Sequence, residues 1–327
     1  MEQNNYHYSI IGHADILNML KKAISNNRLS HSYLFLGPAH IGKETLAVYF
    51  AQILQCQSKN KPCMTCSSCE QIIVNNHPDT QIIKSQDTIK IEEIRNLQHN
   101  LNLNSFNALY KIAIIIDADK MTKEAQNAFL KTLEEPPGKT ILILTTDSEN
   151  KLLPTIISRC QSVAFRNVHT AEIEKALKLL KLSARKAEEL SRLANGKPGL
   201  ILPMAKDPNL LSRRDEQIKL ILNLNKTSQL EKFNRASEIS QKGTGEVKSF
   251  LDFWLSWVRD ILLIRLKLSD SIINTAHFEV LKKESSFYSI DDLRNFISKI
   301  EAVKKSLNYN VNLKLLLETL FLGITTN

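Results

Sequence analysis

Four of the five cysteines of this 327-residue sequence lie between positions 56 and 69, in the spacing C-x6-C-x2-C-x2-C. In a reducing compartment, such a cluster binds metal more often than it forms disulfides. The sequence therefore predicts a metal site formed by Cys56, Cys63, Cys66 and Cys69. The alternative is a set of reduced cysteines with only a structural role.

A glycine-rich segment, Gly37-Pro-Ala-His-Ile-Gly42-Lys43, lies between an expected strand and an expected helix. In that context, backbone N–H groups of the loop can surround a phosphate, and the lysine can reach its outer oxygens. The next residue is normally Ser or Thr, whose hydroxyl binds Mg2+, but here it is Glu44. Thr45 follows one position late and, on a helix, points about 100° away. The segment is either a degenerate nucleotide site or a glycine-rich turn that holds no nucleotide.

A second acidic motif follows the nearly continuous apolar run 111–116, which is typical of a strand buried on both faces of a parallel sheet. Asp117 would lie at the carboxyl end of this strand, where ligands bind in open α/β sheets, and could hold Mg2+ through a water. Active ATPases of this type carry Glu at the next position to orient the attacking water, whereas this chain has Ala118. Asp119 is expected to face another direction. The motif predicts a poor or inactive ATPase, and its alternative is a core strand that ends in two solvated carboxylates.

The elements that position these residues alternate between strand and helix patterns in the first half of the chain. Strands are expected at 32–36, 80–83, 111–117 and 140–146, and helices at 15–24, 45–54, 91–101 and 123–135. This order predicts βαβ units and a parallel α/β sheet. From about Val168 onward only helical patterns remain, with a linker expected at 205–208. We expect α/β and all-α parts in three domains, at 1–166, 167–207 and 208–327.

Composition excludes several classes of protein. The chain is 43% hydrophobic and 24% charged, which excludes wholesale disorder. Only nine glycines, nine prolines and 6% aromatic residues favour a helix-rich fold over a sandwich or barrel. The formal net charge of +9 suits a polyanionic partner, but the basic residues are scattered in pairs, so a solvated surface is the alternative. The apolar stretch 250–268 is interrupted by charged residues, among them Asp252, Arg259, Asp260 and Arg265, and residues 1–8 have no apolar core. We therefore expect a cytoplasmic protein without a spanning helix or secretion signal.

Several longer segments resemble the bacterial clamp loader subunits of DNA polymerase III. They are the cysteine segment, residues 28–38, 77–79, 127–137 and 153–160 and, more weakly, 312–318. The resemblance implies an AAA+ P-loop domain with a zinc insert, a small helical lid domain and a C-terminal helical collar domain. It also implies a five-subunit assembly that uses ATP bound between subunits to load the sliding clamp onto primer-template DNA. The implied partners are the gamma/tau and delta subunits, the clamp and, through the complex, DNA.

Departures from the motor-subunit pattern distinguish among members of this family. Motor subunits carry Ser or Thr at position 44, Glu at position 118 and a sensor arginine in the segment 196–199, which here is Gly-Lys-Pro-Gly. These three losses favour a stator subunit over an ATP-hydrolysing motor. The motor alternative would need Glu44 or Thr45 to bind Mg2+ and Asp119 to replace the missing glutamate. Thr145 and Thr146 fall in the sensor-1 region, and the sequence does not choose between them.

The resemblance also assigns roles to Arg159 and the cysteines. The segment Ser158-Arg159-Cys160 is similar to the arginine-finger motif, so the arginine would reach the ATP of a neighbouring subunit; its alternative is a surface ion pair. The cysteine segment is similar to the family's zinc module, in which four thiolates at about 2.3 Å leave no open position, so the ion is structural. The gap of six residues after Cys56 is shorter than in the family. A stand-alone zinc DNA-binding protein is a further alternative, weakened by the sparse basic residues around the cysteines.

Overall fold

The computed structural model describes residues 10–103, 105, 108–180, 182–224, 227–307, 309 and 311–323. The chain divides into two compact units. The first comprises Met1–Ala176 with Gly196–Leu200, and the second comprises Leu177–Asn195 with Ile201–Asn327. Each unit has its own hydrophobic core.

The first unit is built on a five-stranded sheet in the order β2-β3-β4-β1-β5, in which every neighbouring pair is parallel. Its strands are β1 (Ser32–Leu36), β2 (Thr80–Ile83), β3 (Lys111–Ile115), β4 (Thr140–Thr146) and β5 (Gln161–Ala164). Every residue of β3 and β4 is buried, as the continuous apolar runs predicted. The predicted parallel α/β fold is therefore confirmed.

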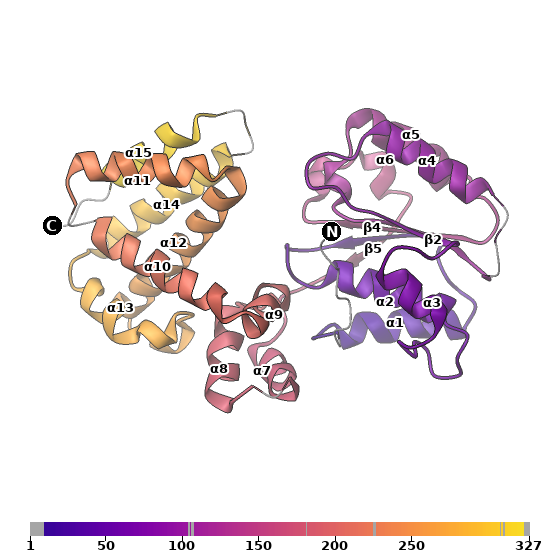
Figure 1. Cartoon of the computed structure of the whole chain (residues 1–327), viewed down its shortest axis with the longest axis horizontal. Coiled ribbons are helices and arrows are strands. Elements are labelled where there is room, and N and C mark those ends of the chain that lie inside the picture. The colour runs from indigo at the N-terminus through magenta and orange to yellow at the C-terminus, as the bar shows by residue number, and fades with distance from the viewer. Residues whose placement is uncertain are drawn as a thin grey trace. The chain divides into compact units, whose positions relative to one another are not determined.

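Helices cover both faces of this sheet (Figure 1). Successive side chains of a strand point to opposite faces, so Ile141 and Ile143 of β4 join one core while Leu142 and Leu144 join the other. The first core is closed by α1 (Ala14–Ser25), α2 (Lys43–Gln55) and α3 (Ser67–Ile73), and the second by α4 (Ile91–Asn102), α5 (Lys123–Glu134) and α6 (Pro154–Ile157). A three-residue 3-10 turn, η1 (Ala118–Lys120), follows β3.

Two details of the sheet differ from the prediction. Strand β5 was not predicted, because Val163 is its only buried residue and the pattern of exposed polar neighbours carries little strand signal. The third strand ends at Ile115, two residues before Asp117, whose backbone adopts a left-handed conformation with φ of 53°. This turn sends the chain away from the sheet immediately after the strand.

The helical patterns after position 168 correspond to α7 (Thr170–Leu179), α8 (Ala184–Leu193) and α9 (Pro198–Lys206). The expected linker at 205–208 is shorter than predicted, because α9 continues through Lys206 and α10 begins at Pro208. Only Asp207 separates the two helices, and its backbone N–H still donates to the carbonyl of Pro203.

The second unit continues with α10 (Pro208–Leu224), α11 (Gln229–Gln241), α12 (Thr244–Arg265), α13 (Phe278–Ser285), α14 (Ile290–Ser306) and α15 (Leu313–Leu322). Its core forms around α12, where the buried indole of Trp254 meets the rings of Phe296 and Phe321 at centroid distances of 4.9 and 5.5 Å. Within the described residues, no helix combines the length and hydropathy needed to span a membrane.

Candidate functional site

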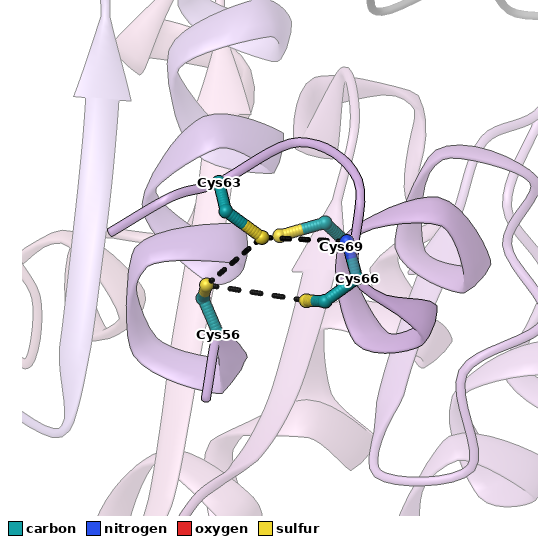
Figure 2. Close-up of side chains that lie close together, drawn as sticks. All are labelled: Cys56, Cys63, Cys66 and Cys69. Atoms are coloured by element: carbon teal, nitrogen blue, oxygen red, sulfur yellow. Dashed lines mark hydrogen bonds between the residues drawn. The ribbon is translucent and has the colours of Figure 1, made fainter. Parts of the chain in front are cut away.

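The four clustered cysteines meet at the junction of α2 and α3 (Figure 2). Cys56 caps the C-terminus of α2, Cys66 is the N-cap of α3, Cys69 lies within α3, and Cys63 projects from the connecting loop. The buried amide of Gln52 on α2 donates to the carbonyl of Cys69 at 3.0 Å, which holds the two helices together. The shorter first gap therefore does not prevent Cys56 from joining the other three.

The sulfur positions fit a tetrahedral ion. All four Sγ atoms lie within 4.8 Å of one another, and Cys56 Sγ is 3.6 Å from Cys63 Sγ and 3.9 Å from Cys66 Sγ. Four thiolates at about 2.3 Å from a central Zn2+ would be separated by about 3.8 Å. The cysteines are free thiols, and their spacing is far longer than the disulfide bond length of about 2.05 Å. The predicted metal site is thus supported by geometry.

The surroundings shift the pKa values of two of the thiols in opposite directions. Hydrogen bonding, chiefly with the Ser58 side chain and the Thr65 backbone, lowers the pKa of Cys63 to about 5, whereas burial raises the pKa of Cys69. The backbone N–H of Cys66 also donates to Cys63 Sγ at 3.3 Å. A cation among the four sulfurs would favour the thiolate form at each position.

The glycine-rich loop lies between strand β1 and helix α2, the place that the sequence predicts for it. Gly42, the N-cap of α2, has φ of 108°, a conformation that residues with a side chain rarely adopt. A Cβ atom on Gly37 would lie 2.7 Å from the carbonyl oxygen of Phe165, so the backbones there approach too closely for any side chain. The loop borders a pocket of about 460 Å³ in the first unit, which is lined by Ala39, His40, Gly42, Lys43, Glu44, Thr45, Lys84, Ile116, Asp117, Thr145, Asp147 and Gly199.

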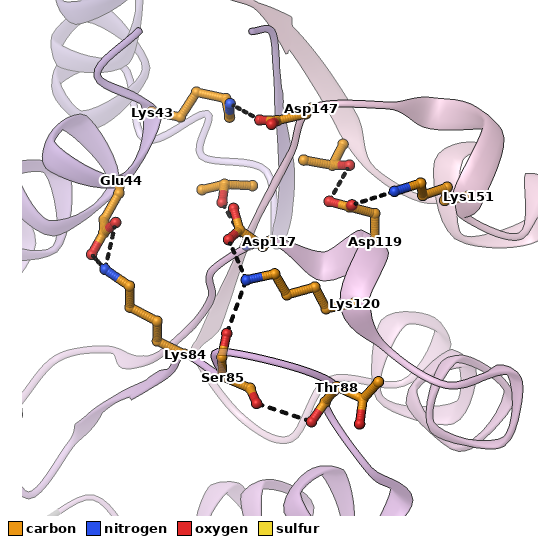
Figure 3. A network of polar contacts seen from close by, with 12 residues as sticks. Lys43, Glu44, Lys84, Ser85, Thr88, Asp117, Asp119, Lys120, Asp147 and Lys151 are labelled. Atoms are coloured by element: carbon orange, nitrogen blue, oxygen red, sulfur yellow. Dashed lines mark hydrogen bonds and ion pairs between the residues drawn. The ribbon is translucent and has the colours of Figure 1, made fainter. Parts of the chain in front are cut away.

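Lys43 is buried and lines this pocket, and its ammonium group already has three acceptors, of which Figure 3 shows Asp147. Its Nζ atom donates to the carbonyls of Gly37 at 2.6 Å and Pro38 at 2.9 Å, and to Asp147 Oδ1 at 2.6 Å. An ammonium group has three protons, so these contacts use all of them. A phosphate could bind Lys43 only by displacing one of these partners.

Glu44, at the position of the Mg2+-binding hydroxyl, is also paired within the chain. Lys84, which directly follows β2, donates to both of its carboxylate oxygens at 2.9 and 3.0 Å (Figure 3). The carboxylate therefore faces a cation of the protein itself. Thr45, which was expected to point away from the loop, is nevertheless among the residues that line the pocket.

The two candidate sensor threonines are adjacent residues at the end of β4, but their side chains have different partners. Thr145 Oγ1 accepts from the backbone N–H of Asp117 at 3.0 Å and lines the pocket, whereas the Thr146 hydroxyl donates to Asp119 Oδ1 at 2.9 Å. The carboxylate of Asp117 is 3.1 Å from Lys120 Nζ. Asp119 thus faces another direction, as predicted, and Thr145 is the threonine beside the phosphate loop.

Arg159 lies apart from this pocket, in the turn that follows α6. Its Nη2 atom is 2.6 Å from Glu134 Oε1 at the end of α5, and Nη1 donates to the carbonyl of Thr155 at 3.1 Å. About a third of its side chain is exposed to solvent. The ion pair that was the alternative to the finger is therefore present, and the finger role stays a prediction. Burial raises the pKa of the neighbouring Cys160 to about 11, so this thiol stays protonated near neutral pH.

The structure thus brings Gly42, Lys43, Glu44, Thr45 and Asp117 to one pocket, with the Gly37 carbonyl bonded to Lys43. The cysteine cluster lies at the opposite end of α2, about 20 Å away by the helical rise. No motif in the sequence predicts the charged partners Asp147, Lys84, Lys120 and Glu134. Asp147 and Lys84 each follow the last residue of a strand, and that position was the available signal.

Comparison with known proteins gives two family matches. Residues 12–169 match the family described as "DNA polymerase III, delta subunit", and residues 208–326 match "DNA polymerase III, delta subunit, C terminal". The chain is 30% identical over 318 residues to DNA polymerase III subunit delta' of Bacillus subtilis, which covers 94% of both proteins. It is 34% identical over 176 residues to subunit delta' of Pseudomonas aeruginosa, covering 52% of this chain and 54% of the relative.

Other matches are more partial or more remote. The subunit tau of Bacillus subtilis is 34% identical over 166 residues, which covers half of this chain and 30% of tau. Among solved structures, a gamma subunit-related protein of Thermotoga maritima is 19% identical with a TM-score of 0.49, covering 93% of this chain and 97% of that one.

The parallel P-loop-type domain, the cysteine cluster and the sequence matches together define a clamp loader subunit of DNA polymerase III. Within that class, the chain belongs to the subunit delta' family, as its similarity to the Bacillus subtilis protein over 94% of both lengths shows.

Proposed function

We propose that this chain acts as the stator of its clamp loader: it hydrolyses ATP poorly or not at all, and it supplies Arg159 to the ATP of a neighbouring motor subunit. The observation that carries the proposal is the internal pairing of the phosphate loop, in which Lys43 is held by Asp147 and Glu44 by Lys84. Both groups that would contact Mg2+ and phosphate therefore have partners inside the chain.

The missing catalytic groups support the same conclusion. Ala118 follows Asp117 and has no group that could orient a water, and Asp119 is turned toward Thr146 and Lys151. The residues present do not fit a complete ATPase site. Binding of a nucleotide phosphate at Lys43 without hydrolysis would require one of the three acceptors, Asp147 or a loop carbonyl, to leave the ammonium group.

The proposed partners are the gamma/tau and delta subunits, the sliding clamp and primer-template DNA held by the assembled complex. The membership of the chain in the delta' family supports a place among the subunits of the polymerase. The side chain of Arg159 is about a third exposed, which supports a contact across a subunit boundary. A planar guanidinium can donate two parallel hydrogen bonds to a phosphate and stabilise the charge that develops there.

We further propose that the cysteine cluster holds a structural Zn2+ ion. Four sulfur ligands at tetrahedral separations leave no position for a substrate, so the ion would join α2 to α3 and carry no chemistry. We also propose domain bounds of 1–166, 167–207 and 208–327. The matches to residues 12–169 and 208–326 support the outer two.

The ATPase rate of a reconstituted loader, measured with clamp and primed DNA, tests the proposal. Replacing Arg159 with Ala should leave assembly intact and lower the rate at least tenfold, because loss of an arginine finger removes charge stabilisation in the transition state. An unchanged rate in an assembled complex would refute the finger.

The motor alternative is favoured by the match to subunit tau over half of the chain. It predicts ATP turnover by the isolated chain, abolished by Lys43→Ala. The stator proposal predicts turnover no higher than the buffer background for both proteins, so this assay separates the two functions.

A further inference from the structure

Arg159 is fixed at its backbone as well as at its side chain. Its carbonyl accepts a hydrogen bond of 2.6 Å from the hydroxyl of Ser32, a fully buried residue at the start of β1. Its backbone N–H donates to the carbonyl of Ile156 at 3.1 Å. The Cα position of Arg159 is thus tied to the sheet, and the direction of the long side chain is what remains to be set.

Glu134 contacts the end of that side chain. It is the last residue of α5, and Glu135, the next residue, leaves the helical conformation because it precedes Pro136. The helix therefore ends with the Glu134 carboxylate 2.6 Å from Arg159 Nη2, while Nη1 bonds the carbonyl of Thr155. The guanidinium is held between α5 and α6, two helices that lie on the same face of the sheet (Figure 1).

We propose that Glu134 is a positioning residue for the arginine finger: its carboxylate holds the guanidinium of Arg159 in the direction from which it meets the ATP of the adjacent subunit. This inference rests on the finger role proposed above for Arg159. A guanidinium has five N–H donors. Within the described chain, the contact with Glu134 uses one donor of Nη2 and the contact with Thr155 uses one donor of Nη1. The remaining donors are available to a phosphate without loss of the Glu134 contact.

A stability role does not explain the pair well. Half of the Glu134 side chain and about a third of the Arg159 side chain are exposed, and ion pairs this exposed contribute little to folding. An unrestrained arginine, however, loses much rotamer freedom when it must dock on a phosphate. Holding the guanidinium before assembly reduces that loss, and a bidentate contact depends on such orientation.

The test uses the reconstituted loader with clamp and primed DNA, into which the chain is introduced as wild type, Glu134→Gln, Arg159→Ala or the double variant. Glu134→Gln should lower kcat about three- to tenfold with little change in KM for ATP, since the finger acts on the transition state. It should cause no further loss in the Arg159→Ala background, because the two residues act through one contact. Glu134→Asp, which keeps the charge, should recover part of the rate.

The adjacent Glu135→Gln is the matched control, because it removes the same charge from an exposed residue one position along and should leave kcat unchanged. Equal melting temperatures and equal incorporation into the complex would show that the variants differ in positioning and not in folding. If Arg159→Ala reduces the rate but Glu134→Gln does not, or if Glu134→Gln raises it, the positioning role is wrong and the finger stands. If neither variant changes the rate, the finger itself is wrong and the inference fails with it.

Discussion

The Nζ atom of Lys43 lies 2.6 Å from Oδ1 of Asp147, a residue 104 positions later in the chain. The lysine comes from the phosphate loop and the aspartate from the end of β4, so the contact joins two neighbouring strand ends at the carboxyl edge of the sheet. The carboxylate occupies one of the directions in which a phosphate oxygen would be bound. A carboxylate of the same chain thus accepts a hydrogen bond from the lysine of the phosphate loop.

This contact leads to a prediction about nucleotide affinity. Asp147→Asn removes a negative charge from the pocket while keeping the size of the side chain, so the isolated chain should bind ATP about three- to tenfold more tightly than wild type. Titration calorimetry with MgATP measures this change. Glu149→Gln removes the same charge two residues along and should not alter the affinity; equal affinities for the two variants would contradict the role assigned to Asp147.

The phosphate loop that contains Lys43 could be predicted from the sequence, but the partner of this lysine could not. The phosphate loop could be predicted because its glycines and lysine are contiguous and follow an apolar run, and the cysteine cluster because its members lie within one short segment. The pairs Lys43–Asp147 and Glu44–Lys84 join residues 104 and 40 positions apart. Their formation depends on strand order, which periodicity alone does not determine.

The strands of the sheet likewise divide into those that the sequence predicts and one that it does not. Strands β1, β3 and β4 were predicted because burial on both faces requires nearly uninterrupted apolar residues. The edge strand β2 was also predicted, and three of its four residues are buried. Strand β5 was missed because it lies at an edge of the sheet and only Val163 is buried. Arg159 was found through a motif, but the Glu134 and Ser32 contacts that fix it arise from the tertiary packing of α5 and β1 around it.

Removal of the metal ligands should affect the first unit. Replacing Cys63 and Cys66 by Ser should abolish stoichiometric zinc binding and lower the melting temperature of that unit, because structural zinc contributes folding free energy. Elemental analysis of the purified protein and thermal unfolding measure the two effects. Cys160→Ser is the control for metal content, since this thiol lies outside the cluster and should leave the zinc in place. A wild-type protein that contains no zinc after expression with zinc present would contradict the site.

In the helical unit, Asp260 of α12 is fully buried and joins two segments of the chain. Its Oδ2 atom accepts from the backbone N–H groups of Ile273 and Asn274 at 3.0 and 2.7 Å and from Asn274 Nδ2 at 2.7 Å. The side-chain oxygen Oδ1 of Asn274 in turn accepts from Arg214 Nη2 at 2.6 Å. The carboxylate thus anchors the segment between α12 and α13 to the longest helix.

Asp260→Ala should destabilise the helical unit by about 2–4 kcal/mol, because it leaves several buried donors without an acceptor. Asp252→Ala on the same helix removes a half-exposed carboxylate that pairs with Lys304, and should cost less than about 1 kcal/mol. Chemical denaturation of both variants measures the difference. Equal losses of stability would show that the buried hydrogen bonds of Asp260 do not hold the segment.

The loss of stability caused by Asp260→Ala should also depend on pH. Burial, opposed by the hydrogen bonds from Asn274, raises the pKa of its carboxyl in the folded state above the ordinary value of 3.8. The folded protein then binds the proton more tightly than the unfolded chain, so this contribution to stability is fully present below the ordinary pKa and is lost as the pH rises through the raised one. The stability difference between wild type and Asp260→Ala should therefore be larger near pH 4 than at pH 7. A difference that grows with pH would mean that the hydrogen bonds and the adjacent Arg259, whose Nη1 atom is 3.3 Å from Asp260 Oδ1, outweigh burial and hold the carboxylate ionised.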